Sequence, residues 1–351
     1  MKKAAIIGCG GIGGYHLGYL TTFKDIELAG FCDLLIDRAK SFVKKAKTGK
    51  AYSCFHKMYD EVKPDMVFIC IPPSCHGEIE FETIRRGIPF FVEKPLALDP
   101  VLAKQIVRQV EEKGLIAASG FQGRYDSIND SAKKFIKDNQ VLHVYASRIG
   151  GMVDVPWFRI KYLSGGQLVE QTIHQMDMLR YLLEDEPDTV YSVANRGYIT
   201  QDEWSGYCID DISTTLVTFK SGITATMVTG VYSLGVSSWD NKMTFGTRSS
   251  RMDYRLITDI TIYDESTASG ENLGGLVSGD GMQRTAEGEV GIKEKSVNDC
   301  GYECDRTFVD AVISGDASKI RSPYADAWKS VAFCLACNKS METGMPVKVE
   351  Y

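Results

Sequence analysis

The stretch AAIIGCGGIG, residues 4–13, decides the fold of the first part of this chain. Its four leading apolar residues are typical of a buried strand, and residues 8–13 match the pattern G-x-G-x-x-G. Glycines at these positions let the backbone turn tightly and let a pyrophosphate approach the positive end of the next helix, expected over 14–23. Glycine-rich turns are common, so the prediction of a dinucleotide site depends on the flanking strand and helix.

An acidic residue supports the same interpretation. Asp33 lies 20 positions beyond Gly13, at the end of a second expected strand over 26–32. A carboxylate there accepts hydrogen bonds from both hydroxyls of an adenosine ribose and repels a 2′-phosphate, which favours NAD over NADP. Arg38 lies close enough to keep NADP as the second choice.

The first 120 residues repeat a strand–helix rhythm. Short apolar runs over 4–8, 26–32, 66–71, 89–93 and 116–120 predict strands, and segments such as 37–47 and 78–86 predict helices between them. Continuously apolar strands are typical of a parallel sheet covered on both faces. We therefore expect a doubly wound, NAD-binding Rossmann domain over residues 1–120.

The pattern changes in residues 121–351. Expected helices cover 127–137, 165–183, 299–314 and 325–342, and expected strands cover 141–149, 213–219 and 224–231. Alternating polarity in the later strands is typical of an antiparallel sheet with one covered face, so we expect a second α/β domain on an open, mainly antiparallel sheet. Residues 266–289 are rich in Gly, Ser and Glu and predict a long loop.

Length and composition narrow the class of protein. A chain of 351 residues suits two domains, and its net charge of −6 argues against a nucleic-acid partner. No apolar stretch approaches the roughly 20 residues that span a bilayer, and the apolar start breaks into glycines too early for a signal peptide. We expect a cytoplasmic protein with neither a nucleic-acid nor a membrane partner.

Ten cysteines are scattered along the chain. The pairs Cys300/Cys304 and Cys334/Cys337 have metal-like spacing, but both lie in expected helices with no histidine nearby. Small buried apolar side chains are the preferred interpretation over a zinc site, and we expect no metal.

A second motif, Glu93-Lys94-Pro95, follows the fourth expected strand. Ligands of open α/β sheets bind outside the carboxyl ends of the strands, so Lys94 is expected to point into the crevice. A partly desolvated lysine beside a cationic nicotinamide can exchange a proton with a hydroxyl group. Taken alone, a lysine at a strand end is more often a solvated surface charge.

A third constellation strengthens the case for Lys94. Glu170, His174 and Asp177 are spaced i, i+4 and i+7 in the expected helix 165–183, which opens with a Gly-Gly turn, so one helix face carries all three. A lone helical histidine is usually structural. One flanked by two carboxylates, in a chain with five histidines, favours a functional role.

Together these motifs resemble the Gfo/Idh/MocA family, named for glucose-fructose oxidoreductase and inositol dehydrogenase. The resemblance runs along nearly the whole chain and includes the segments 8–13, 71–76, 93–95, 120–125 and 165–177. It implies a Rossmann domain followed by an α/β domain that closes over the nicotinamide, binds substrate and often forms oligomer contacts, here a homodimer or homotetramer. It places Lys94 and His174 at the substrate hydroxyl, and it implies that the Lys94–Pro95 bond is cis.

One position departs from the family pattern. Members similar to inositol dehydrogenase carry an aspartate four residues before the histidine, where this chain has Glu170. Its carboxylate reaches one methylene further, so it either orients His174 or binds a substrate hydroxyl. The family often lines its pocket with the stretch before the Gly-Gly turn, which here contains Trp157, Arg159 and Tyr162, although domain packing explains a tryptophan there equally well.

The expected site residues fall into three sets. The cofactor-binding set is Gly8, Gly10, Gly11, Ile12, Gly13, Asp33, Ile71, Pro72, His76, Glu93 and Lys94. The catalytic set is Lys94, His174 and Glu170. The substrate-binding set is Arg124, Trp157, Arg159, Tyr162 and Asp177.

These sets predict an NAD-dependent dehydrogenase that oxidises a secondary hydroxyl of a sugar, glycoside or polyol, with Lys94 or His174 as the proton acceptor. No arginine cluster marks a phosphate or an acid group, so a neutral polyhydroxy substrate is expected. Two alternatives stay open. One is an NAD-dependent glycoside-cleaving enzyme or lyase that works by transient oxidation. The other is a non-catalytic NAD-binding regulatory protein, which would have no need of the Lys94–His174 pair.

Overall fold

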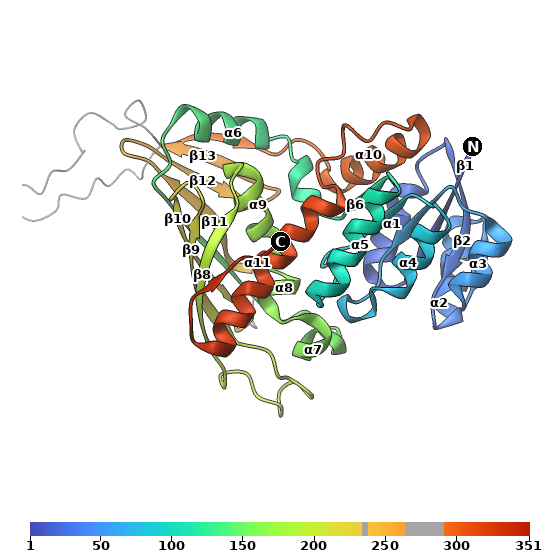
Figure 1. The fold of residues 1–351 in the computed structure, drawn as a ribbon, viewed down its shortest axis with the longest axis horizontal. Coiled ribbons are helices and arrows are strands. Elements are labelled where there is room, and N and C mark those ends of the chain that lie inside the picture. The colour runs from blue at the N-terminus through green and yellow to red at the C-terminus, as the bar shows by residue number, and fades with distance from the viewer. Residues whose placement is uncertain (234–237, 264–290) are drawn as a thin grey trace, which may run out of the picture.

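A computed structural model describes residues 1–233, 238–263 and 291–351. The expected loop over 266–289 lies outside the described residues. The structure consists of a Rossmann domain beside a second, larger sheet, with helices between the two sheets (Figure 1).

The first sheet is fully parallel, in the order β3-β2-β1-β4-β5-β6. Its strands are β1 (Lys2–Ile7), β2 (Ile26–Cys32), β3 (Lys50–Tyr52), β4 (Met66–Ile69), β5 (Phe90–Val92) and β6 (Ala117–Ser119). Its helices are α1 (Gly11–Leu20), α2 (Ile36–Ala46), α3 (Phe55–Val62), α4 (Glu78–Arg85) and α5 (Pro100–Glu112). This order confirms the predicted doubly wound sheet, and its direction reverses between β1 and β4, where dinucleotides bind in this fold.

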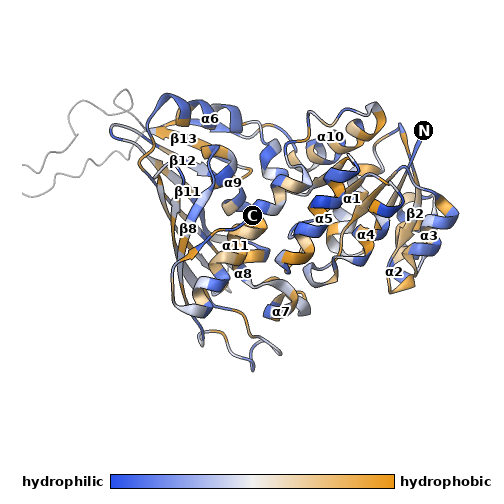
Figure 2. Ribbon diagram, viewed as in Figure 1, coloured by the Kyte–Doolittle hydropathy of each residue, from blue (hydrophilic) through white to orange (hydrophobic). Residues whose placement is uncertain are grey.

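The interior of the Rossmann domain explains its continuously apolar strands. All four residues of β4 are buried, and apolar residues concentrate on the strands of this sheet (Figure 2). One covering helix, α10 (Cys300–Ser314), comes from near the end of the chain and packs Phe308 and Val309 into the same core as Phe68. The chain therefore returns to the first domain at α10 before it adds the last helix and strand of the second domain, although the sequence predicted that all of residues 121–351 belong to the second domain.

The second sheet is mixed, in the order β14-β13-β12-β11-β7-β10-β9-β8-β15, and β7 and β10 are its parallel pair. Its strands are β7 (His143–Gly150), β8 (Pro187–Asn195), β9 (Ile212–Phe219), β10 (Thr224–Gly230), β11 (Ser238–Gly246), β12 (Arg251–Arg255), β13 (Asp259–Tyr263), β14 (Ile292–Lys295) and β15 (Val347–Lys348). The remaining neighbours pair antiparallel, which confirms the mainly antiparallel sheet.

Helices cover the face of the second sheet that is turned toward the Rossmann domain (Figure 1). They are α6 (Asn129–Asp138), α8 (Gln167–Glu170), α9 (Ile173–Leu183) and α11 (Tyr324–Thr343). The opposite face is open, and Tyr145, Leu216 and Tyr191 lie exposed along one row of paired strands.

The expected continuous helix over 165–183 is wrong. It divides into α8 and α9 at Gln171 and Thr172. Both residues bind the sheet through their side chains: the Gln171 amide oxygen accepts from Arg148 on β7, and the Thr172 hydroxyl pairs with Thr229 on β10. These tertiary hydrogen bonds outweigh the local preference for an unbroken helix, so the spacing i, i+4, i+7 does not define one face here.

Two further expectations can be compared with the described residues. The thiols of Cys300, Cys304, Cys334 and Cys337 are free and buried, and burial raises their pKa values, as expected for small apolar side chains. Within residues 1–233, 238–263 and 291–351, no helix is both long and apolar enough to cross a bilayer.

Candidate active site

The glycine-rich turn after β1 is tight where the chain packs and open on its outer side. Gly8 has a φ of +90°, and a Cβ there would lie 2.1 Å from the Cys70 carbonyl oxygen. A Cβ on Gly13 would lie 2.1 Å from the Gly8 carbonyl oxygen. A Cβ on Gly10 or Gly11 would meet nothing within 4 Å. This open backbone at the start of α1 fits a pyrophosphate group.

Asp33 is held beside this turn by two backbone hydrogen bonds. Its Oδ2 accepts from the Cys9 amide at 2.9 Å, and its Oδ1 accepts from the Leu35 amide at 2.8 Å. The carboxylate is therefore fixed at the end of β2, next to the open glycines, where it fits the ribose of a dinucleotide. The open glycines and Asp33 thus lie together near the β1–β4 switch point.

The segment after β4 completes this edge of the sheet. Ile71 contacts the turn, because its Cγ2 lies 3.2 Å from the position of a Cβ on Gly8. Pro72 leads into a short 3₁₀ helix, η1 (Pro73–Cys75), and the next residue, His76, bonds through Nδ1 to Glu80 Oε1 at 2.5 Å. The buried His76 Nε2 has no hydrogen-bond partner among the described residues. A role for these residues in cofactor binding stays a prediction.

Glu93 points into the protein behind Lys94. Its Oε1 bonds to His16 Nε2 at 2.9 Å, and its Oε2 accepts from the Lys94 amide at 3.1 Å. The other nitrogen of His16 bonds to Asp305 of α10 at 2.8 Å. Burial alone would lower the pKa of His16, but Asp305 and Glu93 outweigh it and raise this pKa to about 10. These contacts support a structural role for Glu93 in place of the cofactor contact expected from the sequence.

Lys94 reaches from the Rossmann domain to the second domain. The Lys94–Pro95 peptide bond is cis, which confirms the expectation. The Lys94 ammonium donates to the Glu170 carbonyl oxygen at 2.9 Å and to Glu170 Oε1 at 3.1 Å. The second carboxylate oxygen of Glu170 accepts from the Gln171 amide. Glu170 therefore holds Lys94, and it does not orient His174.

His174 lies beside this pair with its ring in the neutral form. Burial lowers its pKa well below the usual range, and the positive charges of Lys94 and Arg148 lower it further. The ring edge rests against Phe121, with centroids 6.3 Å apart, and no described side chain hydrogen-bonds to the imidazole. A neutral imidazole near a fixed ammonium can accept a proton from a hydroxyl group bound between them.

Two site residues were missed by the sequence interpretation. Gln171 bonds to Glu170 on one side and accepts from Arg148 Nη2 at 2.8 Å on the other. A hydrogen-bonded row therefore runs from Lys94 through Glu170 and Gln171 to Arg148. The signal for Arg148 was present: it shares the inward side of its strand with buried Val144 and Ala146, where a charge is unusual.

Arg124 and Asp177 pair with each other in the interior and are not part of this row. Arg124 Nη2 lies 2.6 Å from Asp177 Oδ1, and both residues are at most 3% exposed. Arg124 also binds Asp326, and Ser330 of α11 donates to Asp177. Because α9 starts anew at Ile173, Asp177 faces α11. These contacts support a structural ion pair in place of the expected substrate contacts.

In the stretch before the Gly-Gly turn, some side chains pack against other residues and others lie at the surface. Trp157 packs against a small buried cluster that includes Phe158. The Arg159 guanidinium lies 4.4 Å from the Trp204 ring and 2.8 Å from Asp154. Tyr162 is 76% exposed on α7 (Lys161–Ser164), the helix that contacts η1. Tyr162 is the most exposed of the three residues, and Arg159 Nε is buried without a hydrogen-bond partner among the described residues.

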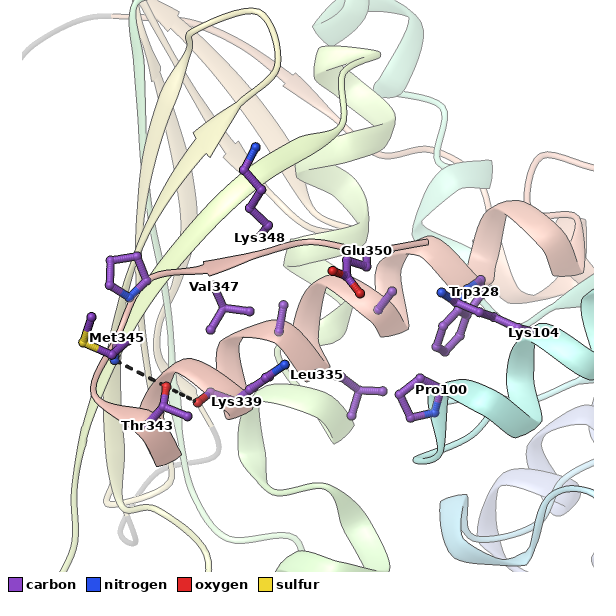
Figure 3. Close-up of a pocket in the computed structure, with 13 residues that line it drawn as sticks. Pro100, Lys104, Trp328, Leu335, Lys339, Thr343, Met345, Val347, Lys348 and Glu350 are labelled. Atoms are coloured by element: carbon purple, nitrogen blue, oxygen red, sulfur yellow. Dashed lines mark hydrogen bonds between the residues drawn. The ribbon is translucent and has the colours of Figure 1, made fainter.

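A groove of about 510 Å³ lies elsewhere, between α5, α11 and the C-terminal segment (Figure 3). The residues that line it include Trp328, Leu335, Val347, Lys104 and Lys339. None of the expected site residues lines it. The candidate active site is the Lys94–Glu170–His174 group, because side chains of both domains meet there.

The fold and this group define a two-domain protein with an NAD-type Rossmann domain. Residues 2–121 match the family model "Oxidoreductase family, NAD-binding Rossmann fold", and residues 139–248 match "GFO/IDH/MocA C-terminal domain". The chain belongs to the Gfo/Idh/MocA family, as the sequence motifs indicated.

Known relatives agree with this membership. The chain is 27% identical over 225 residues to myo-inositol 2-dehydrogenase of Thermotoga maritima, covering 63% of this chain and 66% of that protein. It is 29% identical over 223 residues to scyllo-inositol 2-dehydrogenase (NAD(+)) of Bacillus subtilis, covering 63% and 64%. The matches thus span slightly less than two thirds of each relative. The crystal structure of myo-inositol 2-dehydrogenase from Lactobacillus plantarum shares the fold, with a TM-score of 0.79, 19% identity and 99% of both chains covered.

Proposed function

We propose that this chain is a dehydrogenase that reversibly oxidises a secondary hydroxyl group of a sugar, a glycoside or a polyol, with NAD as its cofactor. The observation that carries the proposal is the junction of Lys94, Glu170 and neutral His174, from two domains. The inositol dehydrogenases among the relatives support the class of substrate.

NAD is favoured over NADP by the geometry of Asp33. Its carboxylate is fixed by two backbone amides beside the glycine turn, so a ribose 2′-phosphate would meet a negative charge that cannot turn away. When bound, the nicotinamide supplies the hydride acceptor. Gly10, Gly11 and Asp33 are the residues that would hold the dinucleotide.

The residues of the chain divide the proton chemistry between them. His174 accepts the hydroxyl proton on a ring nitrogen, because its lowered pKa keeps the imidazole neutral. Lys94 is held by the Glu170 carboxylate and donates a hydrogen bond to the developing alkoxide oxygen. In the reverse direction His174 returns the proton to the new hydroxyl. A cytoplasmic location and a homodimer or homotetramer stay predictions.

A screen for NADH formation tests the proposal. Purified protein is given NAD⁺ with inositols, aldoses and simple glycosides, and absorbance of NADH is followed. The proposal expects NADH from at least one compound. Release of an aglycone without net NADH would contradict it and favour glycoside cleavage by transient oxidation. Binding of NADH with no turnover of any compound would favour a regulatory protein.

A further inference from the structure

Arg148 differs from the other mostly buried arginines of the described residues in its ion pairing. The other arginines with mostly buried side chains each pair with at least one carboxylate: Arg86 with Asp60 and Glu82, Arg124 with Asp177 and Asp326, Arg159 with Asp154, Arg180 with Glu186 and Asp326, and Arg306 with Asp25 and Asp310. Among the described residues, Arg148 bonds through its side chain to a neutral amide, Gln171, and its Nη1 is buried without a partner.

The charges around Arg148 do not balance. The nearby carboxylate, Glu170, is bound to the ammonium of Lys94, and Gln171 and His174 are neutral. One positive charge is therefore left over, on a guanidinium whose pKa is lowered by burial. A buried charge without a counter-charge is strongly unfavourable, and a bound anion would compensate it.

The position of Arg148 places this charge at the reaction site. It lies near the end of β7, on the side of the strand that faces α8 and α9. Its Nη2 is one hydrogen bond from Gln171, which is one hydrogen bond from Glu170, the residue that holds Lys94. The positive charge of Arg148 also lowers the pKa of His174, so the guanidinium lies close to the residue that would meet the reacting hydroxyl.

We propose that Arg148 binds an anionic substituent of the substrate, a carboxylate or a phosphate, and that the substrate is therefore an acidic sugar. The inference rests on the proposed dehydrogenase function and narrows its substrate class. It replaces the neutral substrate expected from the sequence. That expectation relied on the lack of an arginine cluster, but a single arginine carried into the site by the fold is sufficient. A guanidinium binds both carboxylate and phosphate through parallel hydrogen bonds.

The test measures how fast the NAD⁺-loaded enzyme oxidises acidic sugars and their matched neutral sugars. The pairs are galacturonate and galactose, glucuronate and glucose, and glucose 6-phosphate and glucose. We expect at least one acid to exceed its neutral partner about tenfold or more in kcat/KM, the scale of one charge-assisted hydrogen bond. A preference confined to the uronates identifies a carboxylate, and one confined to glucose 6-phosphate identifies a phosphate.

Variants separate substrate binding from structure. Arg148→Gln is expected to lose about 10- to 100-fold on the acid and much less on its neutral partner, and Arg148→Lys to recover part of the loss. Arg108→Gln, on the exposed side of α5, is the control and is expected to match the wild type. The inference is overturned if neutral sugars react as well as acids, or if Arg148→Gln lowers both members of a pair equally.

A binding measurement tests the anion site even if the enzyme oxidises none of the sugars. That lack of oxidation would itself refute the proposed function. Isothermal titration of the NADH-loaded protein with galacturonate and with glucose 6-phosphate then gives the answer. Binding of either acid that Arg148→Gln abolishes supports the anion site. Absence of binding, or binding that the substitution leaves unchanged, overturns it.

Discussion

The glycine turn after β1 and the break between α8 and α9 position functional groups in opposite ways. In the turn, the sequence acts locally: Gly8 and Gly13 are needed because neighbouring backbone oxygens leave no room for a Cβ. At the break, Gln171 and Thr172 leave the helix because they bind two strands of another layer. The glycine motif therefore located the first region from the sequence alone, whereas the second region could be located only in the three-dimensional structure.

Lys94 extends from the end of β5 in the Rossmann domain to Glu170 on α8, beside the break, and its loss is expected to have the largest effect. Lys94→Ala should lower kcat by about 100-fold or more, because a positioned acid or base contributes 10²–10⁴-fold. Binding of NADH, followed by fluorescence titration, should stay nearly unchanged, because the glycine turn and Asp33 are untouched. A variant that keeps more than roughly a tenth of the wild-type rate contradicts the proposed role.

Glycine substitutions sharpen the contrast within the turn. Gly13→Ala forces a Cβ against the Gly8 carbonyl and should lower the free energy of unfolding by about 1–3 kcal/mol or more. Gly10→Ala adds its Cβ to open space and should unfold like the wild type while binding NADH more weakly. Urea denaturation and NADH titration measure the two effects. Equal stabilities of the two variants would show that the turn is not crowded.

Gln171 tests whether the break positions the site. Gln171→Ala removes the link between Arg148 and Glu170 and should lower kcat by about tenfold, the scale of a hydrogen bond to a charged group. Gln105→Ala, on the exposed side of α5, is the matched control and should keep the wild-type rate. Wild-type kinetics in Gln171→Ala would mean that the hydrogen-bonded row does not hold Lys94.

The buried His16 predicts a pH dependence of stability. Its pKa is about 10 in the folded protein and near 6.5 when unfolded, so the folded state binds the extra proton between these values. The stability that His16 contributes is thus complete below about pH 6.5 and is lost as the pH rises through about 10. Urea denaturation from pH 6.5 to 10 should show a steeper loss for the wild type than for His16→Gln. Parallel profiles would show that His16 is not protonated.

Asp33 is expected to change the choice of cofactor and to leave the chemical step unaltered. Asp33→Ala removes the fixed negative charge beside the ribose site, so affinity for NADPH should rise relative to NADH, by about tenfold for one lost charge contact. Titration with both nucleotides gives the ratio. An unchanged ratio would mean that Asp33 does not face the ribose.

The sequence predicted what depends on local pattern. Apolar runs located the five strands that were expected in the first domain, and the family motifs brought Lys94 together with Glu170 and His174, which the structure places on α8 and α9. Prediction from the sequence failed where contacts between distant residues determine the position of a side chain. Asp177 turned inward to Arg124, Glu93 to His16, and Arg148 entered the site from a strand whose pairing no motif encodes. Helical spacing could not reveal these contacts, because each joins residues more than 20 positions apart in the chain.

A crystal structure of the chain with NAD⁺ and a bound sugar tests the central claim most directly. The account predicts one substrate oxygen within about 2.6–3.2 Å of both the Lys94 ammonium and a ring nitrogen of His174, with the adjacent carbon facing the nicotinamide. A bound sugar whose hydroxyls contact neither residue, with Lys94 and His174 turned away from the ring, would contradict it.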